Sequence, residues 1–365
     1  MIRIPLSFNP INTRALAAVL QQYENKHHNL IIDNCEYQFA RVVGVDHAVA
    51  VNSGTAAIHL ALLVAGVEPG DLVMAPTFTY IATLNPIRYL QATPVLLDIE
   101  PQTWNLDPGL LEQALHKYAH AGHLPKALIV VHTYGTPALI SEIINIANRY
   151  GVIVIEDAAE SLGASFEGKS VGTFGHLGVF SFNNNKTITG FGGGMLVTGN
   201  QDMAKRARFL ATQAREDYPY YQHQTVGYNY SINPLAAAYL LSQMPDLEVF
   251  VQKRRHIYQV YRELLFQEII SQEERTGVRS ARWLSAFLLP KGNNVIKTIA
   301  TLLKEGIETR PAWNPMHRQP LYQNSAVFLN RNADEYFNRG LCLPSGTGIT
   351  EAMQHEVVAR LKRLL

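Results

Sequence analysis

The stretch that decides the fold is VIVIEDAAESLGA at residues 152–164, which is followed by FSFNNNKTITGFGGGMLV at residues 180–197. Both contain a short apolar run that gives way to polar residues. Apolar runs without polar alternation are typical of strands buried on both faces, as in a parallel sheet covered by helices. Ligands bind such sheets beyond the carboxyl ends of the strands, where Asp157 and Lys186 fall. The two stretches therefore predict an α/β sheet with a ligand site at one edge.

Further apolar runs precede this pair, and segments with helical periodicity separate them. They are HAVAV at 47–51, LVMA at 72–75, PVLL at 94–97 and ALIVV at 127–131. This alternation indicates a large domain with a mostly parallel sheet. After residue 197 the pattern becomes mostly helical, and strand signals weaken from about residue 283. We expect the large domain at residues 1–245 and a smaller C-terminal α+β domain at residues 246–365, with Pro245 kinking a long helical segment.

Composition narrows the class of protein. The chain has 365 residues and a net charge of +1, from 31 basic and 30 acidic side chains. Such a balance predicts neither a nucleic acid nor a membrane partner. Cys35 and Cys342 lie far apart, which argues against a disulfide framework or a thiolate metal site and fits a reducing compartment. No signal peptide or membrane-spanning run is evident. We expect a soluble, cytoplasmic enzyme without a metal.

Asp157 and Lys186 are the residues best placed for chemistry. A carboxylate at a strand end can keep a pyridine nitrogen protonated, although an Asp there is also a common helix N-cap. A lysine next to an apolar strand and a glycine-rich turn loses proton affinity and becomes an amine nucleophile. A single lysine in a polar loop is more often a solvated surface residue. The occurrence of both on successive strand ends favours the functional interpretation.

A phosphate site completes this set. The residues Asn-Ser-Gly-Thr at 52–55 join an apolar strand to the helix-forming segment that follows. Free amides, hydroxyl groups and the positive end of a helix dipole would meet there, although an ordinary strand-to-helix turn is the alternative. Ser181 can add a second hydroxyl. An anion cradle, a carboxylate and a lysine on neighbouring strand ends match the needs of pyridoxal 5′-phosphate (PLP).

Five short motifs now support a resemblance to a known family. They are Ser53-Gly54-Thr55, PTFTY at 76–80, EDAAE at 156–160, Ser181-Phe182 with Lys186, and GYNY at 227–230. Together they resemble the DegT/StrS sugar-nucleotide aminotransferases, from about residue 37 to the C-terminus. The resemblance implies the PLP-dependent transferase fold type I, a homodimer with shared active sites, and a nucleotide-linked ketosugar as amino acceptor.

The same resemblance assigns roles to individual residues. Lys186 would be the Schiff-base lysine and proton shuttle, and Asp157 would pair with the pyridine nitrogen. Tyr80 would stack on the cofactor, with a core aromatic as the alternative. Glu160 would lie near the phenolic oxygen, with an exposed helical residue as the alternative. The remaining expected contacts are with the phosphate, from Gly54, Thr55, Ser181, and Asn229 of the partner subunit.

A finer resemblance concerns the substrate. NNNKTITGFGGGML at 183–196, IETRPAWNPMH at 307–317 and CLPSGT at 342–347 are similar to the bacillosamine-pathway subgroup. That subgroup aminates UDP-2-acetamido-2,6-dideoxy-4-ketoglucose, with L-glutamate as donor. A GDP- or dTDP-linked sugar, a 3-keto sugar and a non-catalytic PLP-binding or regulatory protein remain alternatives. A sugar dehydratase would have histidine in place of Lys186.

Some residues depart from the family pattern or have no assigned role. The family commonly has arginine after GYNY, whereas this chain has Ser231, whose hydroxyl cannot replace a bidentate guanidinium. The stretch ENKHHNLIIDNCEYQFA at 24–40 lacks the usual glycine-rich approach to the first helix. Trp313 and His317 are candidates for the sugar-nucleotide pocket, with ordinary packing as the alternative.

Overall fold

A computed structural model describes residues 2–24 and 29–365, so that residues 25–28 of the atypical N-terminal stretch lie outside it. Its centre is an eight-stranded sheet with the order β1-β9-β8-β5-β4-β2-β3-β14. Strand β9 is antiparallel to β1 and β8, and the remaining neighbours pair in parallel. The strands are β1 (His47–Val51), β2 (Leu72–Pro76), β3 (Thr93–Leu97), β4 (Ala127–Val131), β5 (Ile153–Asp157), β8 (Leu177–Ser181), β9 (Gly194–Thr198) and β14 (Ala326–Phe328). The predicted α/β class with a large, mostly parallel sheet is confirmed.

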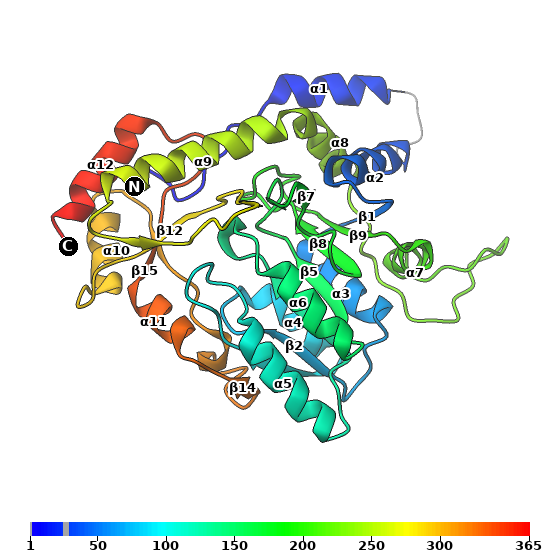
Figure 1. Cartoon of the computed structure of the whole chain (residues 1–365). Helices are drawn as coiled ribbons and strands as arrows, with labels where there is room; N and C mark the ends of the chain where they lie inside the picture. Colours follow the sequence, from blue (N-terminus) through cyan, green and yellow to red (C-terminus); the bar gives the residue numbers. More distant parts are fainter. Residues whose placement is uncertain (1, 25–28) are drawn as a thin grey trace.

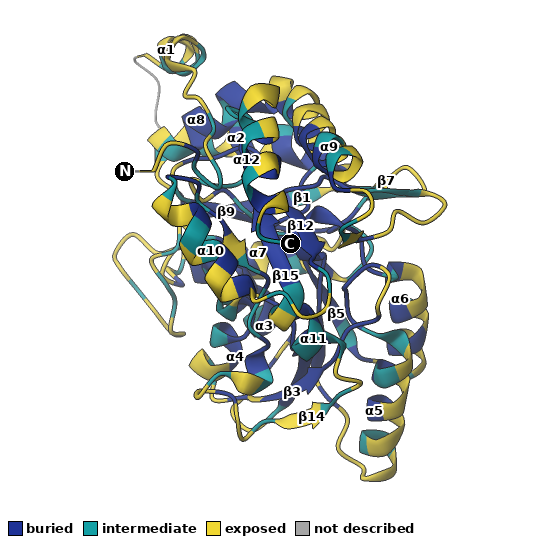
Figure 2. Cartoon of the chain, turned by 90° about the vertical axis from the view of Figure 1, so that its left-hand side faces the viewer, coloured by how far each residue is buried: buried dark blue, intermediate teal, exposed yellow. Residues whose placement is uncertain are grey.

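Apart from the edge strand β14, whose residues are exposed or half-buried, the strands of this sheet bury both faces. In β1, Val49 and Val51 belong to the cluster under α3 (Gly54–Val64), α4 (Asn85–Tyr89) and α7 (Gln201–Ala211). Ala48 and Ala50 belong to the cluster under α2 (Asn29–Val43) and α8 (Pro234–Gln243). Helices α5 (Pro108–His120) and α6 (Ile140–Arg149) cover the second face farther along the sheet (Figure 1). Buried strands therefore lie between exposed helical surfaces (Figure 2). Burial on two sides explains the unbroken apolar runs.

The helices of the large layer have these bounds: α1 (Thr13–Gln22), α2 (Asn29–Val43), α3 (Gly54–Val64), α4 (Asn85–Tyr89), α5 (Pro108–His120), α6 (Ile140–Arg149), α7 (Gln201–Ala211) and α8 (Pro234–Gln243). Short 3-10 turns lie between some of them: η1 (Ile81–Thr83), η2 (Thr133–Gly135) and η3 (Met244–Asp246). The turn η3 contains Pro245 and separates α8 from α9 (Leu247–Leu264), so the expected long helix is interrupted at this proline.

A second layer packs around a smaller antiparallel sheet with the order β10-β12-β15-β13. Its elements are β10 (Ile270–Ser271), β12 (Ser285–Leu288), β13 (Arg310–Pro311), β15 (Gly340–Leu343), α9, α10 (Val295–Lys304), α11 (Asn332–Arg339), α12 (Glu351–Lys362) and η4 (Met316–Arg318). A third, short sheet joins β11 (Val278–Arg279), β6 (Ser165–Phe166) and β7 (Lys169–Ser170).

The chain crosses the expected domain boundary in both directions. Ile4, near the N-terminus, pairs with Ile307 and belongs to the hydrophobic cluster of the smaller layer. Conversely, β14 lies far beyond residue 245 but adds the last parallel strand to the large sheet. The division at residue 245 thus remains a proposal. A segment from each side of this residue packs with the part of the molecule on the other side.

Among the described residues, no helix is both long enough and apolar enough to span a membrane.

Candidate active site

Strand ends bring the predicted residues to one edge of the large sheet. Asp157 is the last residue of β5, and Ser181 is the last residue of the adjacent β8. Strand β1 ends at Val51, directly before the turn into α3. A cavity of about 400 Å³ opens there, and its lining includes Gly54, Thr55, Tyr80, Asp157, Glu160, Ser181, Lys186 and Trp313. Eight of the predicted site residues therefore share one cavity.

The cradle at the start of α3 is built by close contact with β8. The hydroxyl of Ser53 accepts a hydrogen bond from the amide of Ala56 (3.1 Å), so Ser53 is the N-cap of α3. A Cβ atom on Gly54 would lie 2.9 Å from the Cβ of Ser181, which explains why glycine is needed here. Helix amides, the positive end of a helix dipole and two hydroxyl groups thus meet at one point. Such a set binds phosphate.

Asp157 is buried and held by two donors. The hydroxyl of Thr83 donates to its Oδ2 (2.8 Å), and the amide of Ala159 donates to its Oδ1 (3.1 Å). Burial raises the pKa of Asp157, and the hydrogen bond from Thr83 opposes this shift. No helix follows at residues 158–164, so the helix-cap alternative is wrong. A cationic ring nitrogen beside this carboxylate would offset the cost of burying it.

Lys186 lies in a turn beyond β8, with its side chain in the cavity. Its Nζ atom is 4.0 Å from the ring centre of Trp283. Burial lowers the pKa of Lys186, while the carboxylates of Glu160 and Asp157 oppose the shift. A lysine with a depressed pKa has more of the neutral amine that attacks a carbonyl.

Glu160 is also buried, so the alternative of an exposed helical residue is wrong. Its Oε2 accepts a hydrogen bond from the amide of Tyr134 (2.7 Å). Burial raises the pKa of Glu160 to about 7, partly opposed by the charge of Lys186, while Asp157 adds to the rise. The carboxyl can therefore exchange a proton near neutral pH.

Aromatic side chains form the outer wall. Tyr80 is 55% exposed, and its ring centre lies 5.4 Å from that of Trp313. Trp313 in turn stacks on Tyr134 with ring centres 5.5 Å apart. Tyr80 is therefore at the cavity surface and not in the core, and its ring is free on one side to face a planar ligand.

Two predicted residues lie outside the cavity lining. The Nδ1 atom of His317 is 2.8 Å from the hydroxyl of Thr77, and its Nε2 atom is 3.2 Å from Asp334. These contacts fit a packing role between layers. Asn229 is exposed, and its carbonyl accepts a hydrogen bond from the side chain of Asn52 (3.2 Å). Its predicted contribution to a partner's site concerns a second chain and remains a prediction.

Sequence reasoning assigned no role to several residues of the site. Thr83 lies in η1, and nothing in its local pattern indicates a contact with a carboxylate on β5. Trp283 occurs in the run RWLS at 282–285, which has no motif for a lysine partner. Arg254, on α9, is fully buried, although its place in the run Lys-Arg-Arg at 253–255 is typical of a solvated helix face. Their positions depend on how distant segments pack.

Comparisons with known proteins agree with this geometry. Residues 12–362 match the DegT/DnrJ/EryC1/StrS aminotransferase family, and the chain belongs to it. EpsN of Bacillus subtilis, named as a candidate pyridoxal phosphate-dependent aminotransferase, is 44% identical and covers 92% of this chain and 88% of its own length. GDP-perosamine synthase of Caulobacter vibrioides is 36% identical, with 90% of this chain and 89% of the relative covered.

Among solved structures, an aminotransferase of this family from Brucella abortus superposes with a TM-score of 0.89. It is 28% identical, and the match covers 96% of this chain and 95% of that one. The chain is therefore an enzyme, an aminotransferase with the type I fold that uses PLP. The expected fold type, enzyme class and cofactor are confirmed.

Among the residues that the structure describes, no group of three or more metal-ligating side chains was found.

Proposed function

We propose that this chain moves an amino group from L-glutamate to the C4 ketone of a nucleotide-linked 4-keto-6-deoxy sugar. The first candidate acceptor is UDP-2-acetamido-2,6-dideoxy-4-ketoglucose. The observation that carries the amino transfer is the meeting of Lys186, Asp157 and the start of α3 in one cavity. The choice of a sugar nucleotide rests on the motif resemblance and on the names of relatives.

The residues of the cavity fit the cofactor in three places. Gly54, Thr55 and Ser181 would hold its phosphate, because Gly54 brings the helix amides against the Ser181 side chain. Asp157 would pair with the ring nitrogen, and Lys186 would bond covalently to the cofactor's aldehyde carbon. When bound, PLP supplies a carbonyl that takes up and releases an amino group, and a ring that withdraws electrons.

Two side chains of the cavity can handle protons. Burial lowers the pKa of the Lys186 amino group, and the charges of Glu160 and Asp157 oppose this shift. We assign to Lys186 the removal of the proton from the α-carbon of glutamate and, in the second half-reaction, the delivery of a proton to C4 of the sugar. Glu160, with a pKa of about 7, is able to accept or donate a proton next to it at neutral pH.

The aromatic wall supports a sugar nucleotide as acceptor. Trp313 lines the cavity beside Tyr80, whose own assigned role is to stack on the cofactor. Ring faces of this kind bind the apolar side of a sugar or a nucleobase, while polar groups deeper in the pocket fix its orientation. Ser231, two residues after Asn229, is exposed and is too short to replace the usual arginine as an anion clamp.

A GDP-linked acceptor is the second candidate. GDP-perosamine synthases from three bacteria, Caulobacter vibrioides, Escherichia coli and Vibrio cholerae, are 36%, 34% and 33% identical to this chain. Their names favour a GDP-linked sugar as strongly as the motifs favour a UDP-linked one. A non-catalytic binding protein is not favoured, because the cavity keeps both Lys186 and Asp157.

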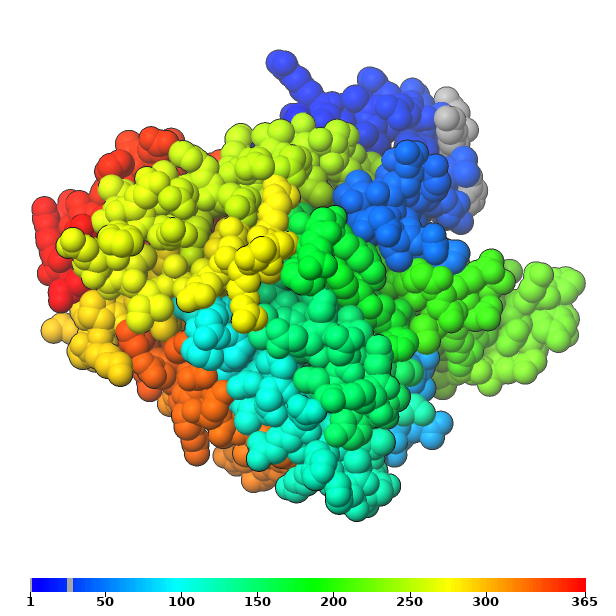
Figure 3. Space-filling view, viewed as in Figure 1, coloured from blue at the N-terminus to red at the C-terminus, as the bar shows by residue number. Residues whose placement is uncertain are grey.

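A homodimer with shared sites is part of the proposal. The segment between α7 and α8 projects from the body of the molecule (Figure 3) and carries Tyr221 and Val226, which are 78% and 76% exposed. Projecting apolar side chains of this kind mark interaction surfaces. The same segment contains Asn229, which we propose reaches the site of the partner subunit.

The test is a coupled assay for 2-oxoglutarate. The chain with PLP and glutamate is offered UDP-, GDP- and dTDP-linked 4-keto-6-deoxy sugars, and a 3-keto sugar as a further arm. We expect more than one equivalent of 2-oxoglutarate per site only with a 4-keto acceptor, because without an acceptor each site can take an amino group from glutamate only once. We expect the highest kcat/KM with the UDP-linked N-acetyl sugar. Highest kcat/KM with a GDP-linked sugar would select the second candidate. No 2-oxoglutarate with any ketosugar would contradict the proposed function.

A further inference from the structure

The amino group of Lys186 lies over the indole ring of Trp283. The Nζ atom lies 4.0 Å from the centre of the indole ring, and both residues line the same cavity. A tryptophan face attracts an ammonium group more strongly than other aromatic rings do. The charged groups that face Lys186 are Asp157 and Glu160 from β5 and the turn after it, and Arg254 from α9.

The indole ring is tied to the same turn that carries the lysine. Its Nε1–H donates a hydrogen bond to the carbonyl of Asn185 (2.8 Å), one residue before Lys186. The carbonyl of Trp283 accepts a hydrogen bond from the buried Arg254 (2.5 Å). Arg254 also donates to Asn9 (3.1 Å), and Asn9 donates to the carbonyl of Lys186 (2.8 Å). Ring and lysine are therefore fixed in one frame of hydrogen bonds.

The backbone before Trp283 is held from two sides. Gly135, in η2, accepts hydrogen bonds from the hydroxyl of Ser280 (2.8 Å) and the amide of Ala281 (2.8 Å). A Cβ atom on Gly135 would lie 2.7 Å from the amide nitrogen of Trp283. Because Gly135 has a φ of 92°, only glycine suits this close approach. The turn η2, which belongs to the part of the chain around the large sheet, thus holds the backbone before Trp283 in place.

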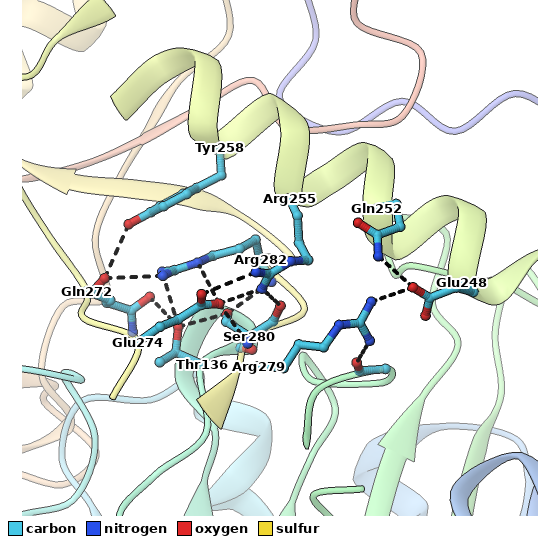
Figure 4. A network of polar contacts seen from close by, with 12 residues as sticks. Thr136, Glu248, Gln252, Arg255, Tyr258, Gln272, Glu274, Arg279, Ser280 and Arg282 are labelled. Carbon is cyan, nitrogen blue, oxygen red and sulfur yellow. Dashed lines mark hydrogen bonds and ion pairs between the residues drawn. The ribbon is translucent and has the colours of Figure 1, made fainter. Parts of the chain in front are cut away.

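Figure 4 shows the other side of this segment. The guanidinium of Arg282 lies 3.8 Å from the ring centre of Tyr258 on α9 and 3.7 Å from Glu274. Arg255 pairs with the same Glu274 carboxylate (2.5 Å), and Glu274 accepts from the amide of Ser280 (2.8 Å). Arg282 itself has a φ of 50°, a conformation that a surrounding network must hold in place.

We propose that Trp283 is a positioning residue that holds the amino group of Lys186 on its indole face whenever this group is not bonded to the cofactor. The proposal rests on the proposed role of Lys186. In that role the amine is released when the donor binds and is bonded again only at the end of the second half-reaction. While it is free, it must stay within reach of the carbon atoms whose protons it moves. A fixed ring at 4.0 Å limits where the released amine can go. The frame through Asn185 and Arg254 keeps the ring in place.

The sign of one measurement separates this role from simple packing. If the ring face stabilises the ammonium, replacing Trp283 with leucine shifts the titration midpoint of Lys186 to lower pH, by about one unit. If the ring only excludes water, its loss admits water, stabilises the ammonium and shifts the midpoint upward. Trp283→Phe keeps an aromatic face but loses the indole N–H, so its shift should be smaller than that of Trp283→Leu.

The experiment uses competitive labelling of the cofactor-free full chain with trace acetic anhydride. The labelled fraction at each lysine is measured by peptide mass spectrometry over a range of pH, so no substrate or turnover is involved. Lys169 is the internal control, because its Nζ atom lies 4.6 Å from the ring centre of Phe174, away from the cavity. Circular dichroism confirms that each variant is folded.

A downward shift at Lys186 in Trp283→Leu, a smaller one in Trp283→Phe, and an unchanged Lys169 would support the proposal. An upward or absent shift in Trp283→Leu would overturn it. Equal shifts in the two variants would also overturn it, because they would trace the effect to the indole N–H. Failure of the proposed sugar amination would leave these labelling results unchanged, so the two proposals fail separately.

Discussion

Lys186 and Glu160 line the same cavity, and the charge of each affects the pKa of the other. Burial lowers the pKa of the lysine and raises that of the carboxyl, while their mutual attraction opposes both shifts. Each shift moves the pKa of its group toward neutral pH, which is the direction expected where protons are transferred. It makes two substitutions informative at the scale of the residue.

Replacing Lys186 with alanine should reduce turnover by at least about a thousandfold, because the chain loses both its covalent attachment point and its proton carrier. Borohydride reduction followed by mass measurement provides an independent readout. The unmodified chain should retain the cofactor after reduction, whereas Lys186→Ala should release it. Lys253→Ala, an exposed change on α9, serves as the control. Turnover in Lys186→Ala close to that of the control would refute the assignment.

Replacing Glu160 with glutamine tests the raised pKa through stability. A carboxyl whose pKa is 4.5 in the unfolded chain and about 7 in the folded one binds its proton more tightly when folded. Its contribution to stability is therefore present at low pH and lost as the pH rises from about 4.5 to 7. Glutamine keeps an oxygen acceptor for the Tyr134 amide without this loss. From pH 5 to pH 8, the variant should gain about 2 to 3 kcal/mol relative to the unmodified chain.

Urea unfolding at the two pH values measures this difference. All other titrating groups are the same in the two proteins. The difference between their free energies of unfolding therefore reports the effect of position 160. A constant difference across the range would contradict a raised pKa for Glu160 in the folded chain.

At the scale of the element, the turn from β1 into α3 depends on the absence of one side chain. Gly54→Ala would bring a Cβ within 2.9 Å of the Ser181 Cβ and push the helix start away from β8. We expect the dissociation constant for PLP to rise about tenfold, because overpacking of this kind costs roughly 1 to 3 kcal/mol. Gly199→Ala is the matched control, since its nearest neighbour would be 3.9 Å away.

Fluorescence titration of each variant with PLP gives the comparison. Equal affinity in Gly54→Ala and Gly199→Ala would mean that the α3 cradle does not hold the phosphate.

Some elements and residues of the site can be predicted from the sequence, and others cannot. The sheet, and the order of Asp157 and Lys186 on its edge, could be predicted because buried parallel strands and strand-end ligand sites leave local patterns. Thr83, Trp283 and Arg254 could not. Each reaches the site from a segment whose position is set by tertiary packing, and a buried arginine in the run Lys-Arg-Arg looks like a solvated one in the sequence.

At the scale of the whole molecule, the projecting segment between α7 and α8 predicts that two chains share each site. If Asn229 serves the partner's cavity, a chain with Lys186→Ala and a chain with Asn229→Ala each lack a different part. A mixed dimer then contains one site with both residues intact. Random association should restore about one quarter of the unmodified activity, since half of the dimers are mixed and each has one complete site. Co-expression with two affinity tags and tandem purification isolates the mixed dimers alone, which should have about one half of the unmodified activity because one of their two sites is complete.

The matched control pairs Lys186→Ala with Asp157→Asn. Both residues line the cavity of a single chain, so no mixed dimer can assemble an intact site from these two. Recovery with Asn229→Ala and none with Asp157→Asn would establish exchange of the projecting segment. If the chain is dimeric but neither mixture recovers activity, Asn229 acts within its own chain. Full activity of Asn229→Ala alone would mean that Asn229 has no part in the site.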